Sequence, residues 1–317
     1  MLGSTGFDWG TYVDWMSEQA GSLAAVADRL CAYRGYKDDA GSVERALRRL
    51  RRRGSRDGGT WGARAVLVFG LPEAVDQRVR WLGQYHSRFT DLPASMAVDL
   101  LRAWSQPPTT ESRTGRAWIA LGHASLAIRA RDHAGAAAHL ARARADLAGA
   151  PPLARLETVL VRAYLATREA PATVADLLAE VPALLDEVTD PVERACLHAR
   201  WIDHRGYALN QVGEPAAAEA LYRSISDDGP PFARARRASG LAFARWKQGA
   251  AAEASDHARR ATEHAGDGGH VRARAMALGL LARITGDPEA HARAIAISRQ
   301  LEDETMLARL GVTRTRS

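Results

Sequence analysis

The sequence predicts a mostly α-helical protein in which a small N-terminal group of three helices precedes an array of helical hairpins. Two features of the composition favour helices: aromatic residues make up only 6% of the 317 residues, and alanine, the best helix former, is abundant. A helix, a tight turn and a second helix then recur through roughly the last two hundred residues, which predicts the array. A chain of this length can form two domains.

Residues 1–72 predict three short helices followed by a strand. The segment "FDWGTYVDWMSEQ" predicts an aromatic-rich first helix, and "SLAAVADRLCAYR" predicts a second one with a polar start. In "SVERALRRLRRRG", residues 42–54, apolar residues at spacings of three and four predict a third helix with a buried stripe of Val43, Ala46, Leu47 and Leu50. Gly58, Gly59 and Gly62 predict a turn, and "ARAVLVFG" (63–70) predicts a β-strand.

This order of elements resembles a winged helix-turn-helix DNA-binding domain. The resemblance implies that the third helix enters the major groove and that "SRDGGTWG" forms the wing. Bases would lie nearest the first residues of the third helix, and phosphates nearer its end and the wing. The nucleic-acid contacts that it implies are Ser42, Arg45, Arg48, Arg49, Arg51, Arg52, Arg53 and Arg56.

Charge clustering in the third helix is the observation that favours duplex DNA as a partner. Six arginines lie among the nine residues from Arg45 to Arg53, and such like charges repel one another. The helix face therefore needs solvent or an anionic partner, and both alternatives stay open. The overall charge of +6 adds little, because nearly all basic residues are arginine, as codon usage alone could produce. Asp38 and Asp39 would face phosphates unfavourably unless they cap the helix.

Residues 73–110 predict two bridging helices, "EAVDQRVRWLGQYHSRF" and "PASMAVDLLRAW". The polar, proline-containing segment "SQPPTTES", residues 105–112, follows them. Its composition predicts a hinge or linker.

Residues 111–310 predict the repeat array. Five segments align, at residues 122–140, 160–178, 204–222, 240–258 and 277–295. Their turn positions recur every 36 to 45 residues and are Arg131, Arg168, Gly213, Gly249 and Gly286. Small residues, Ala136, Ala218 and Ala254, follow five positions later in three of them, where two helices must approach closely.

The pattern resembles the tetratricopeptide repeat (TPR) family, whose unit has about 34 residues. The best match is "ALNQVGEPAAAEALY", in which Gly206, Gly213, Ala218 and Tyr222 stand at the small, turn, small and aromatic positions. Arginine replaces the turn glycine in the first two repeats, and His291 replaces the small residue in the last. The resemblance implies an α-solenoid, because each hairpin leaves an apolar face that a neighbour must cover.

Such arrays generally bind peptides or helices along a groove lined by the first helices. The groove positions that the resemblance implies are Arg155, Arg162, Arg200, Asp203, Tyr207, Asn210, Gln211, Arg236, Phe243, Trp246 and Lys247. Mixed aromatic and basic side chains would suit an acidic or extended segment of a protein partner. Alternatively, Phe243 and Trp246 simply pack between repeats.

No pattern of catalytic or metal-binding residues occurs in the sequence, so we expect a protein that is not an enzyme and has no cofactor or metal. The histidines are scattered, and Cys31 and Cys196 lie far apart, which disfavours a disulfide. No signal peptide or membrane span is indicated, and a cytoplasmic location is expected.

The functional hypothesis is a DNA-binding transcriptional regulator with a TPR sensor or scaffold domain. The alternative is a TPR scaffold that binds proteins without binding nucleic acid. An enzyme with a site between the domains is a third class that the sequence leaves open.

Overall fold

A computed structural model describes residues 7–33, 38–147 and 149–312, and within these ranges every regular element is a helix. The prediction of a mostly α fold is therefore confirmed. The first helices are α1 (Trp9–Ala20), α2 (Leu23–Ala32), α3 (Ala40–Leu50) and α4 (Gly59–Phe69). Next come α5 (Glu73–Gly83), the 3₁₀ turn η2 (Arg88–Asp91), α6 (Ala94–Trp104), the 3₁₀ turn η3 (Thr109–Glu111), α7 (Arg113–Arg129) and α8 (His133–Ala145).

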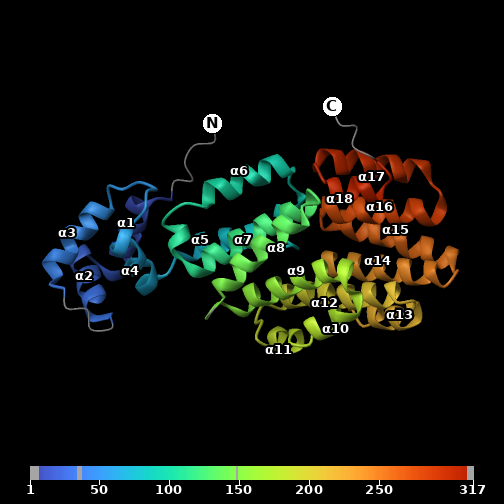
Figure 1. The fold of residues 1–317 in the computed structure, drawn as a ribbon, viewed down its shortest axis with the longest axis horizontal. Coiled ribbons are helices and arrows are strands. Elements are labelled where there is room, and N and C mark those ends of the chain that lie inside the picture. Colours follow the sequence, from blue (N-terminus) through green and yellow to red (C-terminus); the bar gives the residue numbers. More distant parts are fainter. Residues whose placement is uncertain (1–6, 34–37, 148, 313–317) are drawn as a thin grey trace.

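The rest of the chain forms four further groups of helices. They are α9 (Pro152–Glu169) with the 3₁₀ turn η4 (Pro171–Thr173), α10 (Val174–Leu177) and α11 (Val181–Asp186); α12 (Pro191–Gln211) with α13 (Pro215–Arg223); α14 (Pro231–Lys247) with α15 (Ala251–Asp267); and α16 (Val271–Thr285) with α17 (Pro288–Gln300) and α18 (Glu304–Arg309). Each of these groups packs on the next one along the chain, and we call them helix pairs after their two main helices (Figure 1).

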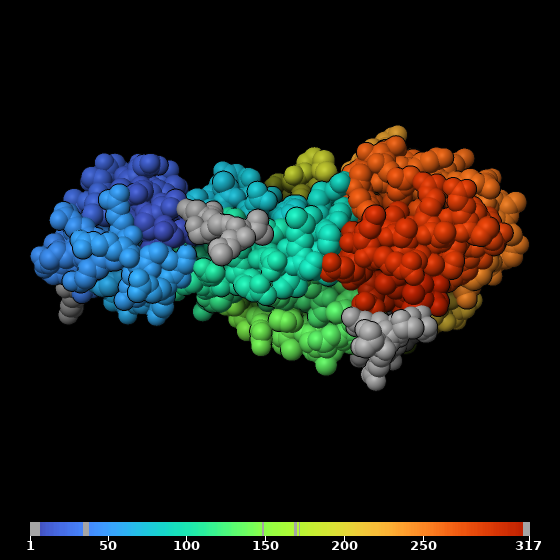
Figure 2. Space-filling model, turned by 90° about the horizontal axis from the view of Figure 1, so that it is seen from above, coloured from blue at the N-terminus to red at the C-terminus, as the bar shows by residue number. Residues whose placement is uncertain are grey.

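Helices α1–α4 form a body of their own that protrudes from one end of the molecule (Figure 2). Its core is built around Trp9, Tyr12 and Met16 of α1, which are fully buried. The predicted stripe of α3 is also buried, as its apolar spacing requires. Asp39 caps α3 by accepting a hydrogen bond from the Ser42 N–H at 3.0 Å, so this acid is used by the helix start.

The predicted strand at residues 63–70 is wrong, because this segment lies in α4 and ends at its cap. Its buried residues, Gly62, Ala65 and Val66, lie on one helical face, while Leu67 is 57% exposed. Gly58 and Gly62 serve close packing: a Cβ on either residue would lie under 3 Å from the Trp9 ring. A short apolar run fits either element, so neighbouring contacts decide it. No strand wing follows α3 in the described ranges.

Four of the five predicted turn positions are confirmed. Arg131, Gly213, Gly249 and Gly286 have φ angles of 63°, 87°, 83° and 74°, in the left-handed region where glycine is favoured. The fifth is wrong, since Arg168 lies inside α9, which ends at Glu169, two residues before Pro171. Proline ends this helix because it has no N–H to donate and restricts the residue before it.

The helices of residues 73–112 pack on the array. Both α5 and α6 contact α7, and the predicted hinge after α6 is also packed. Thr109 is 2% exposed, and Arg116 donates to the carbonyl of Thr110 at 2.8 Å. The segment therefore packs against α7 instead of forming a free linker, and the hinge prediction is wrong.

The start and the end of the array meet, so that the helix pairs curve around an inner face (Figure 1). The Thr305 hydroxyl donates to the carbonyl of Ile128 at 2.6 Å, and the Ala94 N–H donates to the carbonyl of Leu301 at 3.1 Å. These contacts place α6 and α7 beside α18. We call this surface the inner face. It carries Glu157 of α9, Arg200 of α12, Arg236 of α14 and Arg272 of α16.

Close packing around Tyr222 generates the first prediction. Tyr222 of α13 is 2% exposed, and a Cβ on Gly240 of α14 would lie 2.0 Å from its ring carbon Cδ1. We expect Gly240→Ala to lower the free energy of unfolding by about 1–3 kcal/mol through overpacking. The matched control is Gly266→Ala in α15, where nothing lies within 4 Å. It should stabilise by about 0.5–1 kcal/mol. Urea denaturation measures both, and equal effects would contradict this packing.

Candidate functional site

The predicted nucleic-acid contacts lie in α3 and in the turn that follows it. All seven arginines of the set are exposed, and Ser42 is partly buried. The Ser42 hydroxyl accepts a hydrogen bond from Arg45 Nη2 at 2.8 Å. Because α3 buries its apolar stripe, Arg45, Arg48 and Arg49 project from its other side, and the remaining four arginines follow the end of the helix.

Some of these arginines have acidic partners and others have none. Arg48 pairs with Glu44, and Arg51 lies 2.8 Å from Asp14. In the described part of the chain, Arg49, Arg52 and Arg56 have no ion pair or side-chain hydrogen bond. These three exposed, uncompensated guanidinium groups make the face a site of positive potential, which attracts anions.

The predicted groove residues fall into different environments. Arg200 and Asn210 are buried, and Asn210 donates to the carbonyl of Gly206 at 3.0 Å. Partly buried positions are Arg155, Asp203, Arg236, Phe243 and Trp246. Exposed positions are Arg162, Tyr207, Gln211 and Lys247.

Arg200 of α12 forms a buried ion pair with Glu157 of α9. Arg200 is 3% exposed and Glu157 is 0% exposed, and Nη2 of the arginine lies 2.8 Å from Oε1 of the carboxylate. The pair therefore links two neighbouring helix pairs. Its charges are not available to a partner in this conformation.

A segment of the chain itself, residues 84–91 between α5 and α6, lies against the inner face. Gln84 Nε2 and His86 Nε2 lie 3.0 and 2.8 Å from Oε2 of Glu193 in α12. Further along, the Arg272 N–H at the start of α16 donates to Asp91 Oδ1 at 2.8 Å. The segment thus crosses from α12 to α16. Sequence analysis assigned residues 84–89 to a helix, but α5 ends at Gly83.

Tyr85 is the centre of this contact. Its hydroxyl accepts hydrogen bonds from Arg236 Nη2 at 3.1 Å and Arg272 Nη1 at 2.5 Å, and its N–H donates to Glu157 Oε1 at 3.3 Å. The guanidinium carbons of Arg200, Arg236 and Arg272 lie 4.9, 5.4 and 5.3 Å from the ring centroid. Three cations from three helices therefore surround one phenol.

Each of the three arginines also has an acidic partner. Arg236 Nη1 lies 2.9 Å from Asp203 Oδ2, and Arg272 Nε lies 2.7 Å from Asp303 Oδ2, while Arg200 pairs with Glu157 as above. Burial raises the pKa of the Tyr85 hydroxyl, but Arg272, Arg236 and Arg200 outweigh this effect and lower the pKa to about 8. We call the site formed by Arg200, Arg236 and Arg272 around this side chain the Tyr85 seat. It favours negative charge on the phenol oxygen.

Arg272 was missed by sequence analysis, although a signal for it exists. Arg200, Arg236 and Arg272 follow one another at intervals of 36 residues, whereas the last turn positions are 36 and 37 residues apart. Arg272 therefore stands one position before the residue that the groove alignment would give, Ala273. The spacing of 36 residues identifies the third arginine, whereas nothing local in the sequence identifies Tyr85.

Beyond the Tyr85 seat, the inner side of α12 and α14 carries a strip of aromatic residues. The rings of Tyr207 and Phe243 are stacked with centroids 6.2 Å apart, and Trp246 lies 5.8 Å from Phe243. Lys247 Nζ lies within 6 Å of the Phe243 and Trp246 rings. Tyr207 is 40% exposed, so this end of the strip is open to solvent and is not covered by residues 84–91.

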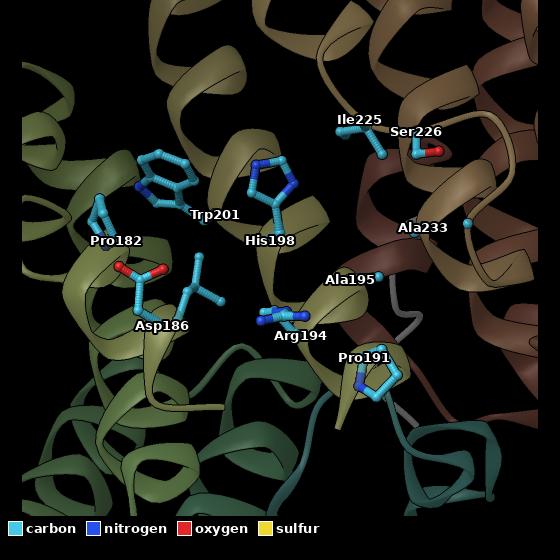
Figure 3. Close-up of a pocket in the computed structure, with 12 residues that line it drawn as sticks. Pro182, Asp186, Pro191, Arg194, Ala195, His198, Trp201, Ile225, Ser226 and Ala233 are labelled. Carbon is cyan, nitrogen blue, oxygen red and sulfur yellow. The ribbon is translucent and has the colours of Figure 1, made fainter. Parts of the chain in front are cut away.

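A separate pocket of about 400 Å³ lies between α11, α12 and the loop that joins α13 to α14. Figure 3 shows His198, Trp201 and Arg194 of α12 between Pro182 and Asp186 on one side and Ile225 and Ser226 on the other. Its size falls within the range of small-ligand sites. No group of charged side chains converges in it.

Comparison with known proteins gives no relative: no family model, curated protein or solved structure matches the chain. Among the described residues, no cluster of histidine, cysteine and acidic side chains is suited to hold a metal ion. No helix in these ranges combines the length and the apolar character that crossing a bilayer requires. Cys31 and Cys196 are both free thiols.

The lowered pKa of Tyr85 generates the second prediction. Absorbance at 295 nm should show one tyrosine titrating near pH 8, and Tyr85→Phe should remove that step. A folded-state pKa below the usual value of 10.0 means that the contribution to stability is present above pH 10 and is lost as the pH falls through about 8. The stability difference between wild type and Tyr85→Phe should therefore grow from pH 8 to 10. Titration only near pH 10 would contradict the arrangement.

The buried pair generates the third prediction. Arg200→Ala leaves Glu157 charged and buried without its partner, which should cost about 3–5 kcal/mol of unfolding free energy. Arg162→Ala on the exposed side of α9 is the matched control and should change stability by less than about 0.5 kcal/mol. Denaturation in urea compares the two variants. Similar stabilities would show that the pair is not buried in solution.

Proposed function

We propose that this protein is a non-enzymatic regulator that binds duplex DNA through the arginine face of α3 and receives a protein or peptide partner on its helix pairs. In this proposal α3 is the contact helix, and the helix pairs from α7 to α17 are a TPR-like solenoid that serves as sensor or scaffold. The single observation that carries DNA binding is the group of exposed guanidinium groups without acidic partners, Arg49, Arg52 and Arg56.

Arginine is well suited to this role, because its planar fork bonds phosphate and the guanine edge bidentately. The helix start also supports the proposal. Asp39 is engaged in capping α3, and Asp38 pairs with Arg64 at 2.7 Å. The acids that precede the helix are thereby partly neutralised, which lowers their repulsion of a phosphate backbone. Without a strand wing, contacts beside α3 would come from the turn that contains Arg56.

The alternative, a scaffold that binds only proteins, is favoured by one specific observation. The inner face already holds residues 84–91, a turn followed by η2, through side-chain and backbone contacts. This observation concerns the helix pairs and does not account for the arginine face. Both functions can therefore belong to one chain, and DNA binding distinguishes the two hypotheses.

Salt dependence of binding tests the DNA proposal and is the fourth prediction. Anisotropy of a labelled duplex should give a log–log slope of about −0.9 per phosphate contacted. Arg52→Ala with Arg56→Ala should weaken binding to all sequences and flatten the slope by about 2, because two contacts are lost.

The control removes two exposed arginines from α17, Arg293→Ala with Arg299→Ala, and so makes the same change in net charge. It should leave the slope within about 0.5 of that of the wild type. If wild type binds no duplex at low salt, or if both double variants behave alike, the arginine face does not contact DNA.

A further inference from the structure

The inner face offers a seat for one phenol that is assembled from three helix pairs. Arg200, Arg236 and Arg272 are spaced 36 residues apart, and each belongs to a different first helix. Their guanidinium groups surround the Tyr85 ring, and two of them donate to its hydroxyl. A repeated residue that converges on one point is a property of the array, independent of the segment that brings Tyr85.

Backbone and side-chain contacts on both sides of Tyr85 hold the rest of the segment. Glu157 accepts the Tyr85 N–H, and Glu193 lies within hydrogen-bonding distance of Gln84 and His86. Asp91 accepts an N–H at the start of α16, and Arg88 donates to the carbonyl of Gly268. The segment is a turn followed by η2, and contacts of this kind to its backbone and side chains are those by which a groove holds a peptide.

We propose that residues Gln84–Asp91 are a built-in ligand of the inner face, and that the partner of this face is a peptide that adopts the same turn and places an unmodified tyrosine in the seat of Tyr85. The proposal rests on the inner face being the partner-binding surface named above. It does not depend on DNA binding.

The geometry of the seat specifies the tyrosine. Phenylalanine lacks the oxygen to which Arg236 and Arg272 donate. A phosphotyrosine adds a group that needs new space, yet the free volume beside Tyr85, Phe232 and Arg236 is about 10 Å³. That is close to the minimum for one water molecule. The seat therefore accepts the side chain of tyrosine and excludes those of phenylalanine and phosphotyrosine.

Competition explains why the built-in ligand matters. A tethered segment acts at an effective concentration that reaches the millimolar range for short connections. A free peptide must therefore displace it, and weakening the tethered copy should strengthen binding of the free one. The exchange leaves the buried Arg200–Glu157 pair in place, since the two residues bond to each other independently of the segment, which the pair contacts through the Tyr85 N–H and the Tyr85 ring.

The test uses the full chain and labelled peptides with the sequence of residues 82–92, LGQYHSRFTDL. Fluorescence anisotropy measures binding to wild type and to Tyr85→Ala, with circular dichroism to check folding. We expect Tyr85→Ala to bind the peptide at least about tenfold more tightly than wild type. Peptides with Phe or phosphotyrosine in place of Tyr should bind that variant at least about tenfold more weakly: Phe loses the hydrogen bonds to charged donors, and the phosphate of phosphotyrosine has no room.

Tyr85→Phe is the second variant and decides the matter if Tyr85→Ala does not fold. It keeps the ring but loses the hydroxyl, so it should also bind the tyrosine peptide more tightly than wild type. His198→Ala, in the separate pocket, is the control and should bind as wild type does.

Equal binding by wild type and the folded variants, or no binding by any of them, would overturn the proposal and make residues 84–91 part of the packed core. Equal affinity for the tyrosine and phosphotyrosine peptides would overturn the choice of an unmodified phenol. A chain that binds the peptide but no DNA would retain this proposal and refute only the DNA-binding function.

Discussion

Neutralisation of buried arginines on the inner face is the constraint on which the rest of the structure depends. Arg200, Arg236 and Arg272 point inward from three successive first helices, and a buried charge is costly unless it is paired. Glu157, Asp203 and Asp303 supply the pairing. All three acids lie on a different helix or helix cap from their arginines, so each pair fixes how one part of the array sits against another.

The acids also determine what the inner face can hold. Apolar residues in place of the ion pairs would often stabilise a protein of this kind, but they would leave a surface with no preference for any one side chain. The arginines keep unused donors after pairing, and these donors converge on the phenol oxygen of Tyr85. A polar inner face therefore selects its occupant by the direction of its hydrogen bonds, whereas an apolar face would select its occupant mainly by size.

Local patterns predicted much of the fold. Spacing of three and four residues identified the buried face of α3, and the turn positions Gly213, Gly249 and Gly286 have the left-handed backbone that glycine allows. Ala136, Ala218 and Ala254, predicted to be small for close helix contact, are fully buried. The failures occur where local sequence is ambiguous: the short apolar run of α4 has both strand and helix character until Trp9 packs on its glycines.

The candidate site was harder to predict because its contacts join distant parts of the chain. Tyr85 meets Arg236 and Arg272 across 151 and 187 positions of sequence, and no periodicity within a helix carries that information. Burial of Arg200 likewise depends on an acid 43 positions earlier. The spacing of the three arginines is present in the sequence, but nothing there identifies the segment that they hold, since it lies outside the repeat.

The position of residues 84–91 in the chain connects the two surfaces of the molecule. These residues follow α5 directly, and α5 follows α4 of the N-terminal body after only a short connection, Gly70–Pro72. Because α5 packs on α7, its C-terminal end is held between the array and the inner segment. Gly83, the last residue of α5, lies close against α7, where a Cβ on the glycine would be 2.5 Å from the Trp118 carbonyl oxygen. An occupant that displaced Tyr85 would therefore act on α5 through the residues that follow it, while the packing of α5 on α7 remained. Any effect of the inner face on the arginine face would then pass through this one helix.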